Sequence, residues 1–451
     1  MVKELVEITG GELISGSLKE KRACNNLSVD SRQINKNTLF VPLAGEKRDG
    51  HDFFQQVYEA GGRFALSARR ACFQAPDFQI IFVEDTLEAM QKLAKAIREG
   101  LGIPLIGITG SVGKTTTREM VAAALGAEKE VFKTPANFNS QVGVPLTLSS
   151  IAQEDIGIIE MGISEFGEMT RLSKMVQPDL AVVTNIGEAH LKQLITKENI
   201  RDQKFHIQDH MAPGGILLLN GEDPILRESH AYEEIQKEYF NCQGENCTCY
   251  AAEIDIQEGL PVFTAHIRGE SLRVKLGVCG IHQISNALAA LAVAWHYGVD
   301  LQRAAKSLEE FKGFPHRQQI RCTGKVTVID DTYNASPDSM RAALQILTDM
   351  PQGNRKIAVL GDMKELGRGE IKIHRAMGSY IKGLPIDYVI TLGKLGAELL
   401  HCLPPGKGKA FMDSEKLAAF LQKYQKPGDV ILFKASNSMG LTQVVDRFVG
   451  E

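Results

Sequence analysis

The 451-residue chain has no apolar run long enough to cross a membrane. Its longest uninterrupted apolar segment, Ala287 to Trp295, is much shorter than the roughly 20 residues that a transmembrane helix needs. The N-terminal segment carries several charged side chains among its apolar positions, which is unlike a secretory signal. We therefore expect a cytoplasmic protein without a membrane span.

The chain also lacks a strong charge of either sign and a dense set of cysteines. Its formal net charge of -4 excludes the basic surface typical of nucleic-acid-binding proteins, so no nucleic-acid partner is expected. Its eight cysteines are spread along the chain, which fits a reducing compartment better than a disulfide-rich secreted domain. Cys242, Cys247 and Cys249 could be zinc ligands, but they lack a paired CxxC spacing, so a polar surface loop is the favoured interpretation.

The length and the pattern of apolar runs predict three α/β domains. Residues 1–100 mix short apolar runs with a helix-like stretch, Leu87 to Glu99, and are expected to form a small α/β N-terminal domain. Residues 101–312 alternate apolar strands and helices, which indicates a central P-loop ATPase-like domain with a mostly parallel sheet. Residues 313–451 repeat the alternation and predict a C-terminal Rossmann-like, doubly wound domain. The expected strands of the last two domains are 105–109, 156–160, 180–185, 215–220, 326–330, 356–360, 388–392 and 430–433.

A glycine-rich segment between a predicted strand and a predicted helix is the most specific local motif. It consists of Gly110, Ser111, Val112, Gly113, Lys114, Thr115 and Thr116. Backbone amides at a helix N-terminus can surround phosphate oxygens, a lysine can reach the terminal phosphates of ATP, and a threonine hydroxyl can bind Mg²⁺. The loop is shorter than the strict P-loop pattern, whose first glycine would fall at Ile108. The competing interpretation is a glycine-rich turn with a chance lysine.

Two further side chains follow successive predicted strands beside this loop. Glu160 ends the strand at 156–160, and His190 follows the strand at 180–185 by a short loop. Ligands of parallel α/β sheets bind at the carboxyl ends of the strands, so we expect both residues to coordinate Mg²⁺. Taken singly, either could be a cap or an ordinary loop residue.

Together these residues resemble the Mur ligase family, three-domain cytoplasmic enzymes of bacterial peptidoglycan synthesis. The resemblance runs the length of the chain, and its most specific segment is Ile329 to Met340. That segment resembles the signature of the family member that adds D-alanyl-D-alanine to UDP-N-acetylmuramoyl-tripeptide, and it implies that Tyr333 and Asn334 contact substrate. As a local pattern, Asn334 to Pro337 is also simply a turn that starts a helix.

The resemblance implies ligand contacts in each domain. In residues 1–100 it places the uridine-diphosphate site at Ser31, Arg32, Lys47 and Arg48, where a solvated charged face is the competing account. Elsewhere it implies roles near ATP for Asn137, Asn286, Arg317 and Asp331, and a substrate role for Asn139. Ser285 or Asn286 could instead be a helix N-cap, and Arg317 could form an interdomain salt bridge.

One further site residue is implied by the resemblance, and two positions depart from the family pattern. The resemblance implies that Lys204 is carbamylated and binds Mg²⁺, unless it lies on an exposed helix. Many relatives carry a glutamate two residues after that lysine, where this chain has His206. Near the C-terminus Asn437 stands where relatives often have arginine, so the acceptor is expected to be held differently here.

The predicted activity is that of an ATP-dependent carbon–nitrogen ligase that forms an acyl phosphate. Its partners would be ATP, Mg²⁺, UDP-N-acetylmuramoyl-tripeptide and D-alanyl-D-alanine, and its C-terminal domain would bind the dipeptide. We expect a monomer. The alternatives are another ligase of the same scaffold, such as a tripeptide-forming relative or a folylpolyglutamate synthase, and a P-loop NTPase switch.

Overall fold

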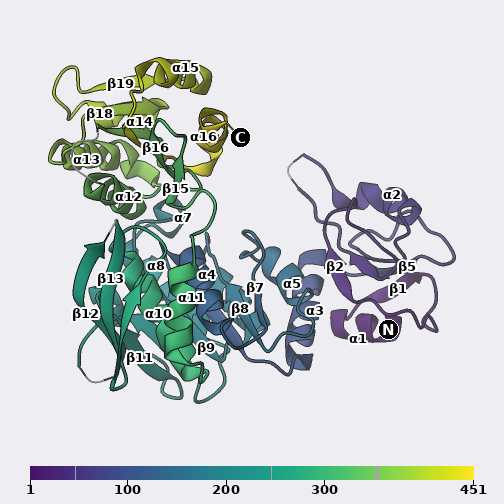
Figure 1. The fold of residues 1–451 in the computed structure, drawn as a ribbon. Coiled ribbons are helices and arrows are strands. Elements are labelled where there is room, and N and C mark those ends of the chain that lie inside the picture. The colour runs from purple at the N-terminus through teal and green to yellow at the C-terminus, as the bar shows by residue number, and fades with distance from the viewer. Residues whose placement is uncertain (46, 245, 258, 351–354, 451) are drawn as a thin grey trace.

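The computed structural model of the chain describes residues 1–45, 47–244, 246–257, 259–350 and 355–450. Glu46, which belongs to the predicted diphosphate segment, lies outside these ranges. The chain forms three sheets in sequence order, each with helices packed against it (Figure 1). The three-domain α/β fold expected from the sequence is therefore confirmed, whereas the boundaries after residues 100 and 312 stay predictions.

The N-terminal domain is a five-stranded sheet with strand order β1-β5-β4-β3-β2. β1 runs antiparallel to β5, and the other neighbouring strands are parallel. Helices α1 and α3 pack on one face through Val2, Leu5 and Met90, and α2 packs on the other through Phe54 and Val57. The elements are α1 (Val2–Thr9), β1 (Glu12–Ser15), β2 (Asn26–Ser28), β3 (Thr38–Phe40), η1 (Gly50–Phe53), α2 (Phe54–Glu59), β4 (Phe64–Ser67), β5 (Gln79–Phe82) and α3 (Thr86–Gly100).

Helix α3 joins the N-terminal domain to the central one. Asp85 caps its first turn by accepting a hydrogen bond from the amide of Glu88. Its N-terminal apolar residues belong to the core of the first sheet, whereas Ala94 packs into the core of the second. Near its end, the Arg98 guanidinium lies 2.9 Å from the Asp179 carboxylate. The helix predicted at Leu87 to Glu99 is thus confirmed and also forms the domain junction.

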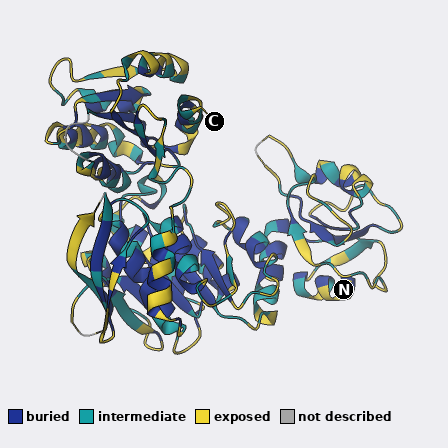
Figure 2. Cartoon of the chain, in the orientation of Figure 1, coloured by how far each residue is buried: buried dark blue, intermediate teal, exposed yellow. Residues whose placement is uncertain are grey.

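The central domain is a nine-stranded sheet with order β14-β13-β12-β11-β10-β9-β6-β8-β7. Helices α4, α10 and α11 cover one face, and α5, α6 and α8 cover the other. In Figure 2 the central strands β6, β8 and β9 are buried along their whole length, whereas β12, at the left, is half-buried or exposed along most of its length. The elements are β6 (Leu105–Thr109), α4 (Lys114–Leu125), β7 (Val131–Lys133), α5 (Gly143–Leu148), β8 (Ile156–Glu160), α6 (Glu168–Val176), β9 (Leu180–Val183), α7 (Leu191–Leu194), α8 (Lys197–Phe205), η2 (His206–Gln208), β10 (Ile216–Asn220), α9 (Pro224–Arg227), β11 (Gln236–Phe240), β12 (Cys247–Gln257), β13 (Leu260–Ile267), β14 (Glu270–Lys275), α10 (Gln283–His296) and α11 (Leu301–Glu310).

The longest apolar run of the sequence forms most of α10, which is buried between the sheet, α4 and α11. A helix that is apolar all round belongs in the interior of a large domain, which accounts for the run. Within the described ranges, no helix combines the length and the apolar character that a membrane crossing requires.

Strand β12 joins β11 in parallel, and β13 and β14 extend the sheet further as antiparallel neighbours. These three strands were not predicted from the sequence. Cys247 and Cys249 lie in β12, and Cys249 is buried. The surface-loop interpretation of the three cysteines is therefore wrong for these two. The thiol sulfurs of Cys242 and Cys247 lie 2.6 Å apart.

The C-terminal domain is a six-stranded sheet with order β15-β16-β20-β17-β18-β19. All neighbours are parallel except β15 and β16. Helices α12, α13 and α14 pack on one face and α15 and α16 on the other, as a doubly wound domain requires. The elements are β15 (Gln319–Cys322), β16 (Thr327–Asp331), α12 (Pro337–Asp349), β17 (Lys356–Gly361), η3 (Gly367–Gly369), α13 (Glu370–Lys382), β18 (Tyr388–Leu392), α14 (Lys394–Leu400), β19 (Gly408–Phe411), α15 (Ser414–Tyr424), β20 (Val430–Lys434), η4 (Asn437–Met439) and α16 (Leu441–Val449).

Candidate functional site

The glycine-rich loop connects β6 directly to α4, as the sequence predicted. Gly110 and Gly113 have φ angles of 146° and 87°, a region that favours glycine. A side chain at Gly110 would also collide with Thr184. The Lys114 ammonium donates to the Gly110 carbonyl at 2.7 Å, so it closes over the loop at the N-terminus of α4.

Residues that follow β9 hold this loop in place. Asn185 accepts hydrogen bonds from the amides of Ser111 and Val112 at 3.0 and 2.9 Å. The Thr184 hydroxyl donates to the Val112 carbonyl at 2.6 Å. The loop conformation is therefore set by the neighbouring strand before any ligand binds.

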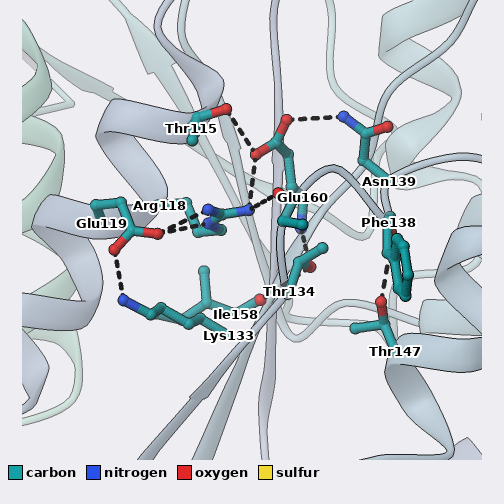
Figure 3. A network of polar contacts seen from close by, with 11 residues as sticks. Thr115, Arg118, Glu119, Lys133, Thr134, Phe138, Asn139, Thr147, Ile158 and Glu160 are labelled. Atoms are coloured by element: carbon teal, nitrogen blue, oxygen red, sulfur yellow. Dashed lines mark hydrogen bonds and ion pairs between the residues drawn. The ribbon is translucent and has the colours of Figure 1, made fainter. Parts of the chain in front are cut away.

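Thr115 and Glu160 face each other across the carboxyl ends of β6 and β8. The Thr115 hydroxyl donates to Glu160 Oε2 at 3.0 Å, and the Asn139 amide donates to Oε1 at 2.8 Å. Arg118, one turn along α4, also donates to Glu160 Oε2, at 3.2 Å (Figure 3). These contacts orient the carboxylate toward the Thr115 hydroxyl.

Arg118 is almost completely buried, with 1% exposure, and it pairs with two carboxylates. Its guanidinium binds Glu119 Oε1 at 2.7 Å as well as Glu160, and Lys133 reaches the other Glu119 oxygen at 2.5 Å. Buried charges of this kind need their partners, since a lone one is strongly destabilising. Arg118 and Glu119 were not among the residues predicted from the sequence, although they lie within three residues of Thr116.

Arg118→Ala is expected to lower the free energy of unfolding by about 3–5 kcal/mol, because it leaves two buried carboxylates without their main partner. Urea unfolding followed by circular dichroism measures the loss. Arg303→Ala is the matched control, because Arg303 is an exposed arginine paired with Glu128 and should cost about 0–1 kcal/mol. Equal losses in the two variants would contradict the structural role of Arg118.

Arg317 lies in the segment that connects α11 to the C-terminal sheet. Its guanidinium carbon lies 3.9 Å from the centre of the Tyr333 ring, a cation–π distance. Its Nε is buried without a hydrogen-bond partner, and within the described ranges no carboxylate forms an ion pair with Arg317. The alternative of an interdomain salt bridge is therefore not supported, and the guanidinium is available to an anion.

Lys434, a buried cation at the end of β20, was not predicted from the sequence. Its ammonium donates to Asp331 Oδ2 at 2.6 Å and to the Asn334 carbonyl at 2.8 Å. Burial lowers the pKa of Lys434, Asp331 opposes that shift, and Arg317 adds to it. Lys434 thus ties the end of β16 to the turn that carries Asn334.

That turn also starts a helix, as its local pattern predicted. Ser336 caps α12 in a capping box with Ser339, and Pro337 is the first helical residue.

Two adjoining cavities lie between the central and C-terminal domains, with volumes of about 690 and 330 Å³. Thr115, Arg317 and Tyr333 line both of them, so the cavities share a wall. Burial lowers the pKa of Lys114 in the smaller cavity, Glu160 opposes the shift and Arg317 adds to it. The predicted residues that line the smaller cavity are Ser111, Val112, Gly113, Lys114, Thr115, Thr116, Asn137, Asn139, Glu160, His190, Asn286, Arg317, Asp331, Tyr333 and Asn334.

His190 lines both cavities but points toward the C-terminal domain. Its backbone is left-handed, with φ of 63°, and its Nδ1 lies 2.7 Å from Glu365 Oε2. This contact lowers the pKa of Glu365. His190 therefore contributes an interdomain contact in addition to its predicted place beside the phosphate loop.

Asn286 lies one turn inside α10 rather than at its start, because the helix begins at Gln283. The N-cap alternative for Asn286 and Ser285 is therefore wrong. The Asn286 amide oxygen accepts from the Thr117 hydroxyl at 3.0 Å, and its amide nitrogen donates to Gln283 at 2.8 Å. The side chain faces Gly113 of the phosphate loop.

Lys204 lies on α8 and is buried, with 1% exposure. The alternative of an exposed helix is therefore wrong. Burial, together with the charge of Lys114, places the pKa of Lys204 well below its ordinary value. His206, where relatives often carry a glutamate two residues after the lysine, instead contacts the Asp209 carboxylate at 3.1 Å.

The four predicted diphosphate contacts lie in the N-terminal domain and do not line either cavity. Arg32 is exposed and holds Asp30 through two hydrogen bonds of 2.9 and 2.8 Å. Lys47 and Arg48 are exposed, and Ser31 is partly exposed. The structure thus places these residues together on one domain but apart from the phosphate loop.

The predicted Mg²⁺ ligands do not form a preassembled cluster of three carboxylate or imidazole groups. In the described part of the chain, such a cluster occurs only at His316, Asp330 and Asp446. Arg321 bonds both carboxylates there, at 3.2 and 3.1 Å, so that cluster is an ion-pair network. Mg²⁺ bound with ATP commonly uses only one or two protein carboxylates together with phosphates and waters, and the Thr115–Glu160 pair fits that requirement.

Three family profiles match successive parts of the sequence. They are described as Mur ligase family, catalytic domain (residues 24–98), Mur ligase middle domain (residues 108–294) and Mur ligase, glutamate ligase domain (residues 316–437).

Curated relatives match over nearly the whole chain. A UDP-N-acetylmuramoyl-tripeptide–D-alanyl-D-alanine ligase of Bacillus subtilis (strain 168) is 36% identical and covers 99% of this chain and 98% of its own length. The protein of the same name from Escherichia coli (strain K12) is 31% identical and covers 98% and 97%.

Solved structures agree with the sequence relatives. A crystal structure of MurF from Acinetobacter baumannii superimposes with a TM-score of 0.91 at 30% identity, covering 100% of this chain and 99% of that one. The MurF ligase of Thermotoga maritima in complex with ADP gives a TM-score of 0.84 at 30% identity, covering 94% and 97%.

Proposed function

Because the chain belongs to the Mur ligase family, we propose that it joins D-alanyl-D-alanine to UDP-N-acetylmuramoyl-tripeptide at the expense of ATP. The observation that carries the proposal is that Lys114 and Arg317, from different domains, line one cavity beside the Thr115–Glu160 pair. The two relatives named above act, by name, on the same substrates. The enzyme would work as a cytoplasmic monomer.

The proposed reaction has two steps. A carboxylate of the tripeptide attacks the γ-phosphorus of ATP, so that an acyl phosphate forms and ADP leaves. The amine of D-alanyl-D-alanine then attacks the acyl carbon, phosphate departs, and the amine loses a proton as the amide forms. Phosphoryl transfer of this kind depends mainly on positioning and charge neutralisation, so no protein nucleophile is needed.

The residues of the smaller cavity supply that neutralisation. Lys114 and the first amides of α4 face the β- and γ-phosphates, since a helix N-terminus favours anions. Arg317 approaches from the C-terminal side, with its plane fixed by Tyr333. Asn286 and Asp331 hold the adenosine, while Asn137, Asn139 and Asn334 border the path to the acceptor. The larger cavity receives the tripeptide end and the dipeptide.

The residues at Thr115 and Glu160 fit Mg²⁺. Both offer hard oxygen donors, which this ion prefers, and they are adjacent at the cavity wall. His190 lines the same cavity and, if it released Glu365, would complete the protein's side of the site. When bound with ATP, the ion would neutralise phosphate charge.

Lys204 fits carbamylation because its amine is buried and its pKa is low. The neutral amine is the form that attacks carbon dioxide, and the resulting carbamic acid loses a proton to become an anion. The carbamate places an anion, attracted to Lys114, where a protonated amine would be repelled by it. The carbamate would then add a carboxylate-like ligand for Mg²⁺ to the site.

We expect ¹³C NMR of the protein in labelled bicarbonate to show a carbamate signal at neutral pH that Lys204→Met lacks. The signal should weaken as the pH falls, because protonation of Lys204 removes the reactive amine. In buffer free of carbon dioxide, Lys204→Met should also raise the melting temperature, since it removes an amine whose charged form is disfavoured by burial and by Lys114. Lys174→Met changes an exposed lysine and should alter neither measurement; an unchanged signal in Lys204→Met would refute the assignment.

The proposed function is tested by phosphate release from ATP. With UDP-N-acetylmuramoyl-tripeptide present, release should require D-alanyl-D-alanine, and mass spectrometry should show the pentapeptide product. Release that depends on a free diamino acid with the dipeptide precursor would assign the chain to a tripeptide-forming relative. Hydrolysis that is independent of any acceptor would favour an NTPase switch.

The proposed uridine-diphosphate site lies on the N-terminal domain, at Ser31, Arg32, Lys47 and Arg48. Its separation from the phosphate loop means that the tripeptide must extend from one domain to the other. Closure of the domains around the bound substrates would also exclude water from the acyl phosphate.

A further inference from the structure

Two of the three neighbouring cysteines of the central domain have their sulfur atoms in contact. Cys242 follows β11, Cys247 begins β12, and their thiol sulfurs lie 2.6 Å apart. Both are free thiols in the structure. Because the sulfurs of a disulfide lie about 2.05 Å apart, little movement of either side chain would bring this pair to bonding distance.

The backbone around the two thiols is paired on both sides of the turn. The Tyr239 amide donates to the Asn246 carbonyl at 2.8 Å, and the Asn241 amide donates to the Cys249 carbonyl at 2.8 Å. Gly244, within the turn, has φ of 115°, in the region that favours glycine. The contact between the sulfurs is therefore a feature of the folded turn between β11 and β12.

The two thiols differ in acidity. The hydrogen bond from the Cys242 thiol lowers the pKa of Cys247 to about 7, and the charge of Arg268 lowers it further. The same hydrogen bond raises the pKa of Cys242. Both side chains are partly exposed, so a small reagent can reach them. Since the thiolate is the nucleophile of disulfide exchange, Cys247 is the residue that would react first.

The third cysteine and a metal ion are both poor partners for this pair. Cys249 is buried, its thiol donates to the Leu288 carbonyl at 3.2 Å, and burial raises its pKa. A structural zinc site almost always has four ligands. Within the described part of the chain, no group of three potential metal ligands includes Cys242 or Cys247.

The pair lies at the same edge of the central sheet as the phosphate loop, but outside the two cavities. Strand β11 is parallel to β10, and β10 is parallel to β9. A side chain at Gly221, just after β10, would collide with Cys242, so Cys242 packs against the neighbouring strand end. Neither cysteine is among the described residues that line the cavities, so a reagent can reach the pair whether or not those cavities are filled.

We propose that Cys242 and Cys247 form a reversible disulfide site that is oxidised by low-molecular-weight disulfides. The Cys247 thiolate attacks one sulfur of the oxidant, whose other half leaves as a thiolate, and a mixed disulfide forms at Cys247. Cys242 then loses its proton and attacks Cys247 Sγ, which forms the intramolecular bond and displaces the second half of the oxidant. The protein gives up two electrons, and its two thiol protons pass to the two released thiols.

The full-length protein is incubated with oxidised glutathione, its remaining thiols are alkylated in denaturant, and the chain is cleaved after glutamate. Glu245 separates the two cysteines in the sequence, so their peptides should stay joined until a reducing agent is added, with Cys249 alkylated. Cys242→Ser and Cys247→Ser should each lack the joined peptides. Cys322→Ser changes an exposed cysteine and should keep them at the wild-type level.

Two results would overturn the proposal. One is glutathione bound separately to Cys242 and Cys247 in the wild type, without joined peptides. The other is joined peptides that survive in Cys247→Ser, because the bond would then involve Cys249. The first result needs no variant, so it decides the matter even if a serine variant folds poorly, and neither result bears on the proposed ligase activity.

Discussion

Lys114→Ala is expected to lower kcat/KM for ATP by on the order of 10³-fold, the size of effect seen when a cation that neutralises transition-state charge is removed. Lys114 closes over the loop by bonding the Gly110 carbonyl and lines the cavity from the central domain. Burial lowers the pKa of Lys114. A bound triphosphate stabilises the protonated form of the amine, so the Lys114–phosphate interaction should be strongly favourable. Acceptor-dependent phosphate release measures the effect.

The control for this loss is Lys174→Ala, which changes an exposed lysine of the same domain. The Lys114 variant should keep its circular dichroism spectrum and melting temperature, because the ammonium contributes little to packing. Turnover near the wild-type level in Lys114→Ala would remove the basis for a phosphate-binding loop. A lowered melting temperature would instead point to a structural role.

Arg317→Ala should reduce kcat by about 10²- to 10³-fold. Its guanidinium reaches the cavity from the segment between the central and C-terminal domains and has a buried nitrogen without a partner. A group left unpaired in the free enzyme costs stability and is expected to gain its partner from the ligand. The melting temperature of the free protein should therefore not fall in this variant.

Arg317→Lys tests whether activity depends on the positive charge of Arg317 or on the planar shape of its guanidinium group. Lysine keeps the positive charge but cannot present a planar group to Tyr333, so partial activity is expected. Arg303→Ala, which removes an exposed arginine, should leave the rate unchanged. Wild-type kcat in Arg317→Ala would show that the C-terminal domain does not supply the cation for phosphoryl transfer.

The two largest expected effects come from residues on different domains. Lys114 begins helix α4 of the central domain, and Arg317 belongs to the connection to the C-terminal sheet. Any motion between these domains changes the separation of the two charges, so turnover should depend on domain closure. In Figure 1 the N-terminal domain contacts the central domain at a different place, through α3 and α5.

The amino-acid sequence by itself determined the α/β class, the phosphate loop and the carboxylate at the end of β8. These features depend on local pattern: apolar runs predict strands, and glycines before Lys114 predict a turn into a helix. The sequence resemblance also selected the C-terminal residues Tyr333 and Asn334.

Only the tertiary structure decided which distant side chains share an environment. Arg118 and Lys434 carry no local signal, because a lone lysine or arginine is usually a solvated surface residue. The burial of Lys204 could not be predicted from the sequence either, because its helix α8 is polar. The Lys204 side chain becomes buried only when α8 packs against α6 and the sheet. Contacts between residues far apart in the chain depend on how whole sheets pack, and that packing is what places the ammonium groups of two domains around one cavity.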